Sequence, residues 1–170
     1  SSREFIKLTI PEGYTCRQIF ALLEENRICT ALDAAAYAAN GELKEYWFLD
    51  GVARGDKYCL EGYLAPDTYT FYLNDDPERV LHKFLSAFDY RFTDRMRSDF
   101  ETMKKRYAQQ LSNNGYTEEY INANPLTLHK VVIIASLIEK ETANDNESYI
   151  ISSVIYNRLT DPGKNPFLNI

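Results

Sequence analysis

The most constraining feature of this sequence is an apolar stretch, residues 126–159, which reads LTLHKVVIIASLIEKETANDNESYIISSVIYNRL. The pattern predicts two apolar helices separated by a polar break at residues 144–146. A helix that is apolar on nearly every face is a buried helix. The first of the two nevertheless carries Glu139, Lys140 and Glu141 at its far end. Because a buried charge is costly unless it is paired or functional, these side chains are the first candidates for a functional site.

Glu139 is the strongest candidate of the three. Side chains three and four positions away are neighbours on a helix, and those around Glu139 are all small: Ala135, Ser136, Thr142 and Ala143. Glu139 therefore lies on an inward face with room for a ligand, where desolvation is expected to raise the pKa of its carboxyl. A raised pKa suits a general acid near neutral pH. In the structural alternative, which stays open, Glu139 pairs with an Arg or caps a polar network.

Charge and composition argue against several classes of partner. The chain has 170 residues and a net charge of −6, without a dense run of Lys or Arg, so we expect no nucleic acid partner. Its cysteines (Cys16, Cys29 and Cys59) and two histidines lack the spacing of a zinc site, so we expect no metal. No phosphate-binding glycine-rich loop and no evident buried Lys for a pyridoxal Schiff base are seen, so we expect no cofactor.

The first part of the chain predicts a small lobe of one strand and two helices. Residues 5–10 alternate between apolar and polar and predict a half-buried strand. Thr15 and Gln18 form a capping box that begins a helix. A second short helix is expected to follow Thr30 and to end at Gly41. Its predicted apolar positions are Leu32, Ala35, Ala36 and Ala39.

The middle of the chain predicts extended backbone followed by a long helix. Residues 57–73 read KYCLEGYLAPDTYTFYL, which we interpret as extended segments around a turn at Pro66 and Asp67. Asp76 is a natural N-cap, and apolar residues spaced by three or four positions then continue to Leu111, which predicts one long helix, straight or kinked. With the apolar helices of residues 126–159, this pattern predicts an α+β fold.

Four phrases of the sequence carry a resemblance to a known family. They are LTIPEGYTCRQIFALLEEN near the start, LEGYLAPDTYTF in the middle, and LTLHKVVIIASLIEKET with SSVIYNRL near the end. In order and spacing, the chain resembles the YceG-like family of endolytic murein transglycosylases. The resemblance covers the chain from about residue 8 to residue 170.

The resemblance implies two domains and a location. Residues 1–55 are expected to form a small LysM-like β/α lobe, and residues 56–170 a mainly helical catalytic domain with short strands. Because the family continues beyond the YNRL phrase, the catalytic domain is expected to be truncated at its C-terminal end. The resemblance also implies a single-pass protein of the bacterial cell membrane, held by a preceding N-terminal helix, with this region outside the cytoplasm.

The resemblance further implies a reaction and a set of site residues. The family cleaves the bond between N-acetylmuramic acid and N-acetylglucosamine within nascent peptidoglycan strands and leaves anhydro ends, which terminates strands. The first Glu of its EKE phrase, the catalytic acid, falls on Glu139. The implied substrate-binding residues are Glu61, Tyr63, Asp67, Tyr69, Asn157 and Arg158. For Asp67 and Arg158, a role in bracing the fold is an equal alternative.

A second interpretation assigns the chain to a different class of protein. A non-catalytic module could bind peptidoglycan strands or recruit peptidoglycan synthases through the LysM-like lobe. An acid in a buried niche of small residues favours the enzyme, since a pure binding module has no use for one.

Overall fold

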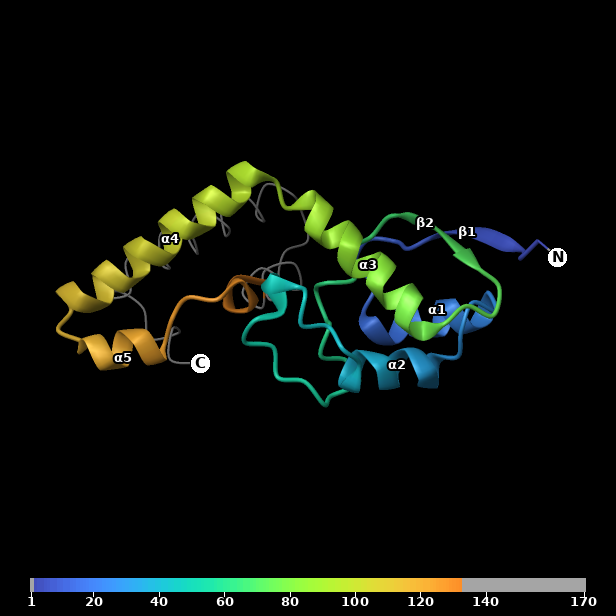
Figure 1. Cartoon of the computed structure of the whole chain (residues 1–170), viewed down its shortest axis with the longest axis horizontal. Helices are drawn as coiled ribbons and strands as arrows, with labels where there is room; N and C mark the ends of the chain where they lie inside the picture. The colour runs from blue at the N-terminus through green and yellow to red at the C-terminus, as the bar shows by residue number, and fades with distance from the viewer. Residues whose placement is uncertain (1, 133–170) are drawn as a thin grey trace. The chain divides into compact units, whose positions relative to one another are not determined.

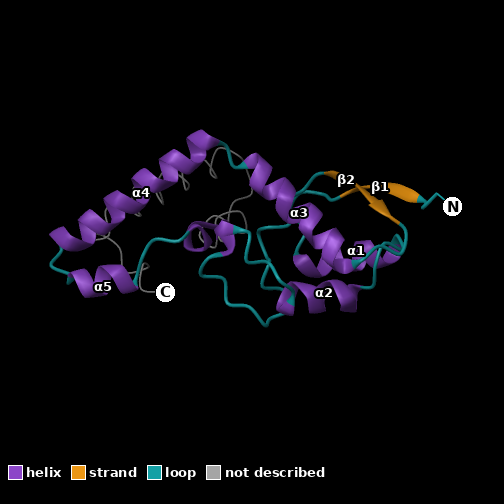
Figure 2. Ribbon diagram, viewed as in Figure 1, coloured by secondary structure: helices purple, strands orange, loops and turns teal. Residues whose placement is uncertain are grey.

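The structure is a computed structural model that describes residues 2–132 of the chain. In this part, the order of elements is β1, α1, α2, η1, β2, α3, α4 and α5 (Figures 1 and 2). The chain divides into two compact units, Ser1–Phe92 and Thr93–Ile170. Helices and a small sheet occur together, which confirms the α+β class.

The two strands form an antiparallel sheet that closes the first unit. β1 (Phe5–Thr9) pairs with β2 (Thr68–Tyr72), with Leu8 opposite Tyr69 and Ile6 opposite Phe71. Leu8, Tyr69 and Phe71 are buried, while their neighbours along each strand are exposed. This alternation confirms the predicted half-buried strand over residues 5–10, and it places Tyr69 and Phe71 on the same face of the sheet.

Helix α1 (Cys16–Glu25) begins where the sequence predicts. The Thr15 side chain accepts a hydrogen bond from the Gln18 backbone N–H, and the Gln18 side chain accepts one from the Thr15 backbone, so the capping box is complete. The helix buries Cys16, Ile19, Phe20 and Leu23.

Helix α2 (Ala31–Asn40) has the predicted bounds but a different buried face. It buries Ala34, Ala35, Ala38 and Ala39. Leu32 is 78% exposed and Ala36 is also exposed, so the predicted stripe is wrong at these two positions. Helices α1 and α3 both pack against α2, and the smooth alanine surface allows this close approach, whereas Leu32 projects outward.

An aromatic core joins the remaining elements of the first unit. The short helix η1 (Trp47–Leu49) inserts Phe48, whose ring lies 5.8 Å from that of Tyr63 and 4.7 Å from that of Phe88. Phe88 belongs to α3 (Pro77–Arg91), which begins with the predicted Asp76 cap and Pro77. Such ring pairs add to the stabilisation from burial alone.

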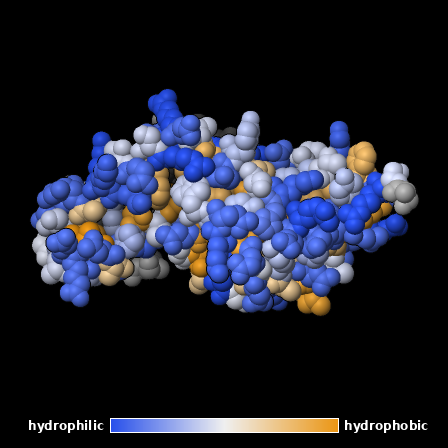
Figure 3. All heavy atoms as spheres, viewed as in Figure 1, coloured by the Kyte–Doolittle hydropathy of each residue, from blue (hydrophilic) through white to orange (hydrophobic). Residues whose placement is uncertain are grey.

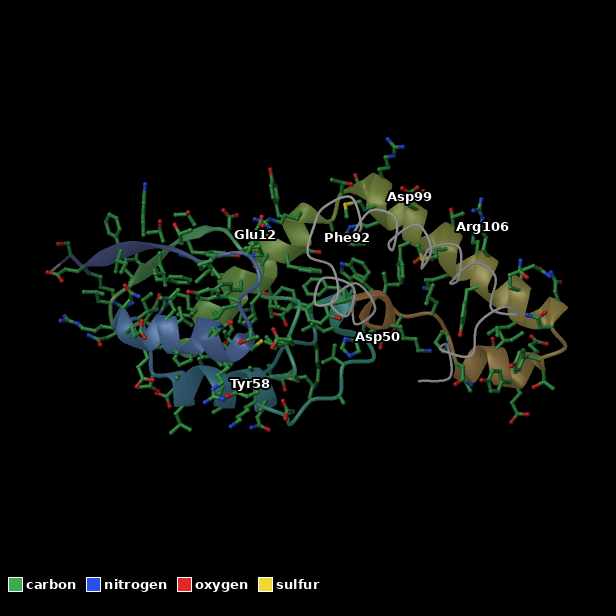
Figure 4. The ribbon with its side chains drawn as sticks, turned by 180° about the vertical axis from the view of Figure 1, so that it is seen from behind. Glu12, Asp50, Tyr58, Phe92, Asp99 and Arg106 are labelled. Carbon is green, nitrogen blue, oxygen red and sulfur yellow. The ribbon has the colours of Figure 1, made fainter. Side chains whose placement is uncertain are left out.

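The predicted long helix is in fact two helices. α3 ends at Arg91, and α4 (Asp94–Asn113) begins after Thr93, whose hydroxyl accepts a hydrogen bond from the Met96 N–H. Figure 4 labels Phe92, the residue that directly follows α3. The sequence pattern continues across this point because both helices keep apolar residues at the same spacing, and the Thr93 cap is what divides them.

The second unit is described as far as residue 132. It contains α4, α5 (Glu118–Ala123) and a further helical segment at residues 128–132. The Thr127 hydroxyl accepts a hydrogen bond from the Lys130 N–H and so caps the start of this segment. Among the described residues, no helix has the length and apolar character needed to cross a membrane.

The first compact unit, Ser1–Phe92, contains residues on both sides of residue 55, and the domain boundary expected there stays a prediction. β1 needs β2 as its partner, and η1 needs Phe88 of α3, so both contributions come from after residue 55. The segment before β2 also differs from the predicted extended chain. Residues 56–63 form successive turns, with hydrogen bonds from Cys59 N to Asp56 O and from Tyr63 N to Leu60 O.

Candidate functional site

The candidate site residues fall into two groups. Glu139, Asn157 and Arg158 lie outside the described residues. Glu61, Tyr63, Asp67 and Tyr69 lie in the first unit, on the turns before β2 and on β2 itself. The geometry below therefore concerns the LEGYLAPDTY phrase.

Glu61 caps a helix that is distant in sequence. Both of its carboxylate oxygens lie 3.1 Å from the backbone nitrogen of Cys16, the first residue of α1. A carboxylate at a helix N-terminus satisfies an unpaired N–H and interacts favourably with the helix dipole. Glu61 thus anchors the turns of residues 56–63 to α1, and its side chain is otherwise exposed.

Tyr63 is a core residue. Its side chain is 0% exposed and is enclosed by Phe48 and by Phe88, whose ring centroid lies 5.3 Å away. Burial raises the pKa of its hydroxyl well above the ordinary value. Its position supports a packing role within the first unit.

Asp67 sits at the centre of a hydrogen-bonded turn. Its carboxylate accepts hydrogen bonds from the Thr68 N–H at 2.8 Å and from Arg91 Nη2 at 2.9 Å. The Thr68 bond and then the Arg91 bond lower the pKa of the carboxyl. Its backbone oxygen accepts from the Ile10 N–H at 2.8 Å, just after β1. These contacts favour the bracing alternative for Asp67.

The buried Tyr69 side chain stabilises the same turn. Its ring is 5% exposed and lies 4.5 Å from that of Phe84, while its hydroxyl donates to the Ala65 carbonyl at 2.7 Å. Burial raises the pKa of the hydroxyl to about 12. Arg91, which also donates to the Pro66 carbonyl, completes the bracing of residues 65–67.

The four predicted residues of the phrase thus each make a different contact within the first unit. Their partners, Cys16, Arg91 and Ile10, were not predicted from the sequence. Only the middle phrase itself could have signalled such bracing, since nothing local relates Glu61 to a helix that begins 45 residues earlier.

A second polar cluster, also missed, surrounds His82 on α3. Tyr46 Oη lies 2.6 Å from His82 Nδ1, and Tyr37 Oη lies 3.2 Å from Nε2. Glu45 Oε1 lies 3.2 Å from Nδ1. The cluster links α2, the loop before η1 and α3, and its tyrosine hydroxyls are partly desolvated, which raises the pKa of each.

The described residues hold no group of three or more metal-ligating side chains. The three cysteines are free thiols. Cys16 is buried, and Cys59 Sγ donates to the Ala38 carbonyl. Burial raises the pKa of the Cys29 thiol to about 11 and that of Cys16 further.

Comparison with known proteins places the chain in a family. The sequence model of the YceG-like family matches residues 1–166. An endolytic murein transglycosylase of Streptococcus pneumoniae serotype 2 (strain D39 / NCTC 7466) is 30% identical over 167 residues, which is 89% of this chain and 26% of that protein. One of Bacillus subtilis (strain 168) is 29% identical over 167 residues, 90% of this chain and 39% of that protein.

The chain therefore spans about a quarter to two fifths of the length of these relatives. No solved structure shows a significant match. The family match covers nearly the whole sequence, and the LEGYLAPDTY phrase that carries the resemblance forms one ordered, hydrogen-bonded element. This chain belongs to the YceG-like family.

Proposed function

We propose that the protein is an endolytic lytic transglycosylase that cleaves nascent peptidoglycan strands, with Glu139 as its catalytic acid. The observation that carries this proposal is the family match over residues 1–166, together with relatives named endolytic murein transglycosylase. The niche of small residues predicted around Glu139 supports the choice of residue.

The reaction needs a single carboxyl. Glu139 donates its proton to the glycosidic oxygen as the bond from the anomeric carbon of N-acetylmuramic acid breaks. The primary hydroxyl of the same sugar then attacks that carbon and gives its proton to the Glu139 carboxylate. The products are an anhydro sugar end and a free N-acetylglucosamine hydroxyl, and no water is consumed. A hydrolysing glycosidase, in contrast, employs a second carboxylate.

The first unit has a supporting role in this proposal. The order strand, helix, helix, strand over residues 5–72 supports a LysM-like lobe that takes its second strand from β2. Glu61, Tyr63, Asp67 and Tyr69 act by bracing this lobe, while Asn157 and Arg158 line the substrate groove. The protein is anchored to the bacterial membrane, with this region outside the cytoplasm, where nascent strands and their synthases are found.

The test is digestion of uncrosslinked glycan strands by the intact protein and by its Glu139→Gln variant. Loss of a positioned general acid is expected to lower the rate by about a hundredfold or more. Glu141→Gln is the matched control, because it makes the same change two residues away, and it should retain most of the activity. Mass spectrometry of anhydromuramyl ends is the readout.

Two outcomes would count against the proposal. If Glu139→Gln released anhydro ends at the wild-type rate, Glu139 would not be the catalytic acid. Strand binding by the intact wild-type protein without any cleavage would favour the alternative, a peptidoglycan-binding or synthase-recruiting module.

A further inference from the structure

The outer face of the β1–β2 sheet carries a group of exposed side chains that the proposed reaction does not use. We call this face the sheet platform and define it by the outward positions of the two strands. These are Phe5, Lys7, Thr9, Thr68, Thr70 and Tyr72. The alternation that buries Leu8, Tyr69 and Phe71 forces these residues outward.

Two aromatic rings stand at one end of the platform. Phe5 is 65% exposed and Tyr72 is 38% exposed, and the two are directly opposite in the strand register. The hydrogen bond from Leu73 N to Glu4 O flanks this pair, which makes it the closer, non-hydrogen-bonded type. Exposed aromatic residues at such a position offer an apolar surface that no described element covers.

The rings form part of a shallow open pocket of about 240 Å³. Its lining consists of Phe5, Thr70, Phe71, Tyr72 and Lys83. The volume falls below the range of sites for drug-sized ligands and suits a single ring of sugar size. Ring faces pack against the C–H face of a pyranose, and Thr70 adds a hydroxyl at the edge of the pocket.

Three cations lie on or beside the platform, although the chain carries a net charge of −6. Lys7 is one of the platform residues, and Arg3 and Lys83 contact others. The Arg3 guanidinium lies 5.6 Å from the Tyr72 ring centroid, and the Lys83 ammonium donates to the Thr70 carbonyl. None of the ion pairs found in the described part of the chain involves Arg3, Lys7 or Lys83.

The acidic groups close to the platform do not cancel this charge. The Asp75 carboxylate, which follows β2, is already bonded to Arg79 Nε at 2.7 Å and to the Asp76 N–H. Glu4 precedes Phe5 on the strand, so the alternation of side chains directs it to the opposite face. Around β1 and β2 the surface is mainly hydrophilic, with isolated hydrophobic groups (Figure 3).

We propose that the sheet platform is a binding site for the substrate strand that is separate from Glu139. A sugar ring packs on Phe5 and Tyr72, and the free carboxylates of the stem peptides pair with Arg3, Lys7 and Lys83. Charge complementarity favours a strand with carboxylates as the ligand, because a neutral glycan would offer no negative charge to the three cations. The inference rests on the proposed function for the identity of the strand.

The test measures binding of soluble, uncrosslinked glycan fragments that carry stem peptides, using intact protein with Glu139→Gln to prevent cleavage. Phe5→Ala and Lys7→Glu remove the ring and reverse one charge without touching the core. Each is expected to weaken binding about fivefold or more, and added salt should weaken wild-type binding. Neutral N-acetylglucosamine oligomers should bind more weakly than the charged fragments.

Matched controls make the same changes elsewhere. Tyr90→Ala removes a ring that is 90% exposed on α3, and Lys105→Glu reverses an exposed charge on α4. Both should change the dissociation constant less than about twofold. Far-UV circular dichroism verifies that each variant is folded.

Several results would overturn the proposal that the sheet platform binds the substrate strand. These are wild-type affinity in both Phe5→Ala and Lys7→Glu, equal losses in the controls, or binding to vesicles of anionic lipid with none to the glycan. Cleavage is assayed separately, so failure of Glu139→Gln to abolish anhydro ends would overturn the proposed reaction and leave the binding result standing.

Discussion

Glu61 holds two distant segments of the first unit together, while its contact with substrate stays a prediction. Its carboxylate accepts from the first N–H of α1, so Glu61→Ala should lower the free energy of unfolding by about 1 kcal/mol, the usual cost of losing a helix cap. Urea denaturation measures the change. Glu12→Ala is the control, because Glu12 is exposed in the turn before α1 and makes no hydrogen bond within the described part (Figure 4). If Glu61→Ala and wild type had equal free energies of unfolding, the capping role of Glu61 would be contradicted.

Asp67 gives a prediction about pH at the same scale. Its pKa is lower in the folded protein, through Thr68 and Arg91, than in the unfolded chain. Such a carboxyl contributes stability above its unfolded-state pKa of about 3.9 and loses it as the pH falls through the folded value. Wild type should therefore lose more stability than Asp67→Asn between about pH 5 and about pH 2. Urea denaturation across this pH range measures the free energy of unfolding, and the exposed Asp50→Asn is the control. Parallel curves of stability against pH for wild type and Asp67→Asn would contradict the prediction.

Among the elements, α2 shows that an apolar residue on a helix is not necessarily buried. Leu32 is 78% exposed on α2, whereas Leu23 of α1 is 0% exposed. Leu32→Ala should change the free energy of unfolding by less than about 0.5 kcal/mol, as is usual at the surface. Leu23→Ala should cost about 2–5 kcal/mol, since it leaves a cavity in a packed core. Thermal or urea unfolding of both variants is the measurement, and similar losses in the two would contradict the observed face of α2.

For the whole molecule, the decisive feature is that the first unit closes only when distant segments meet. A fragment of residues 1–92 contains both strands, α3 and the aromatic core, and it should unfold cooperatively. A fragment of residues 1–55 lacks β2 and α3, which exposes Leu8, Ile10 and Phe48, and it should not. Circular dichroism during urea titration and the dispersion of amide NMR signals distinguish the two. Cooperative unfolding of the shorter fragment would contradict this expectation and support the predicted domain boundary at residue 55.

Local chemistry explains what could be predicted from the sequence. The Thr15 capping box, the Asp76 cap and the alternation of β1 each act within a few residues, so their physics is readable from neighbours along the chain. The α+β class and the family follow from such patterns and from the four phrases of the family resemblance. The position of Glu139 in a niche of small residues is also a sequence-level prediction, and it stays one, because that residue lies outside the described part.

The tertiary structure decided everything that depends on contacts between distant residues. Periodicity made Leu32 part of a stripe, but which face of α2 is buried depends on α1 and α3, which pack against it. The LEGYLAPDTY phrase suggested a groove, yet the roles of Glu61 and Asp67 depend on Cys16 and Arg91, 45 and 24 residues away. The sequence determined by itself the caps of α1 and α3, the alternation of β1 and the family, since these rest on short-range spacing. Burial and pairing required the fold, because hydrophobic packing and hydrogen bonding act through space.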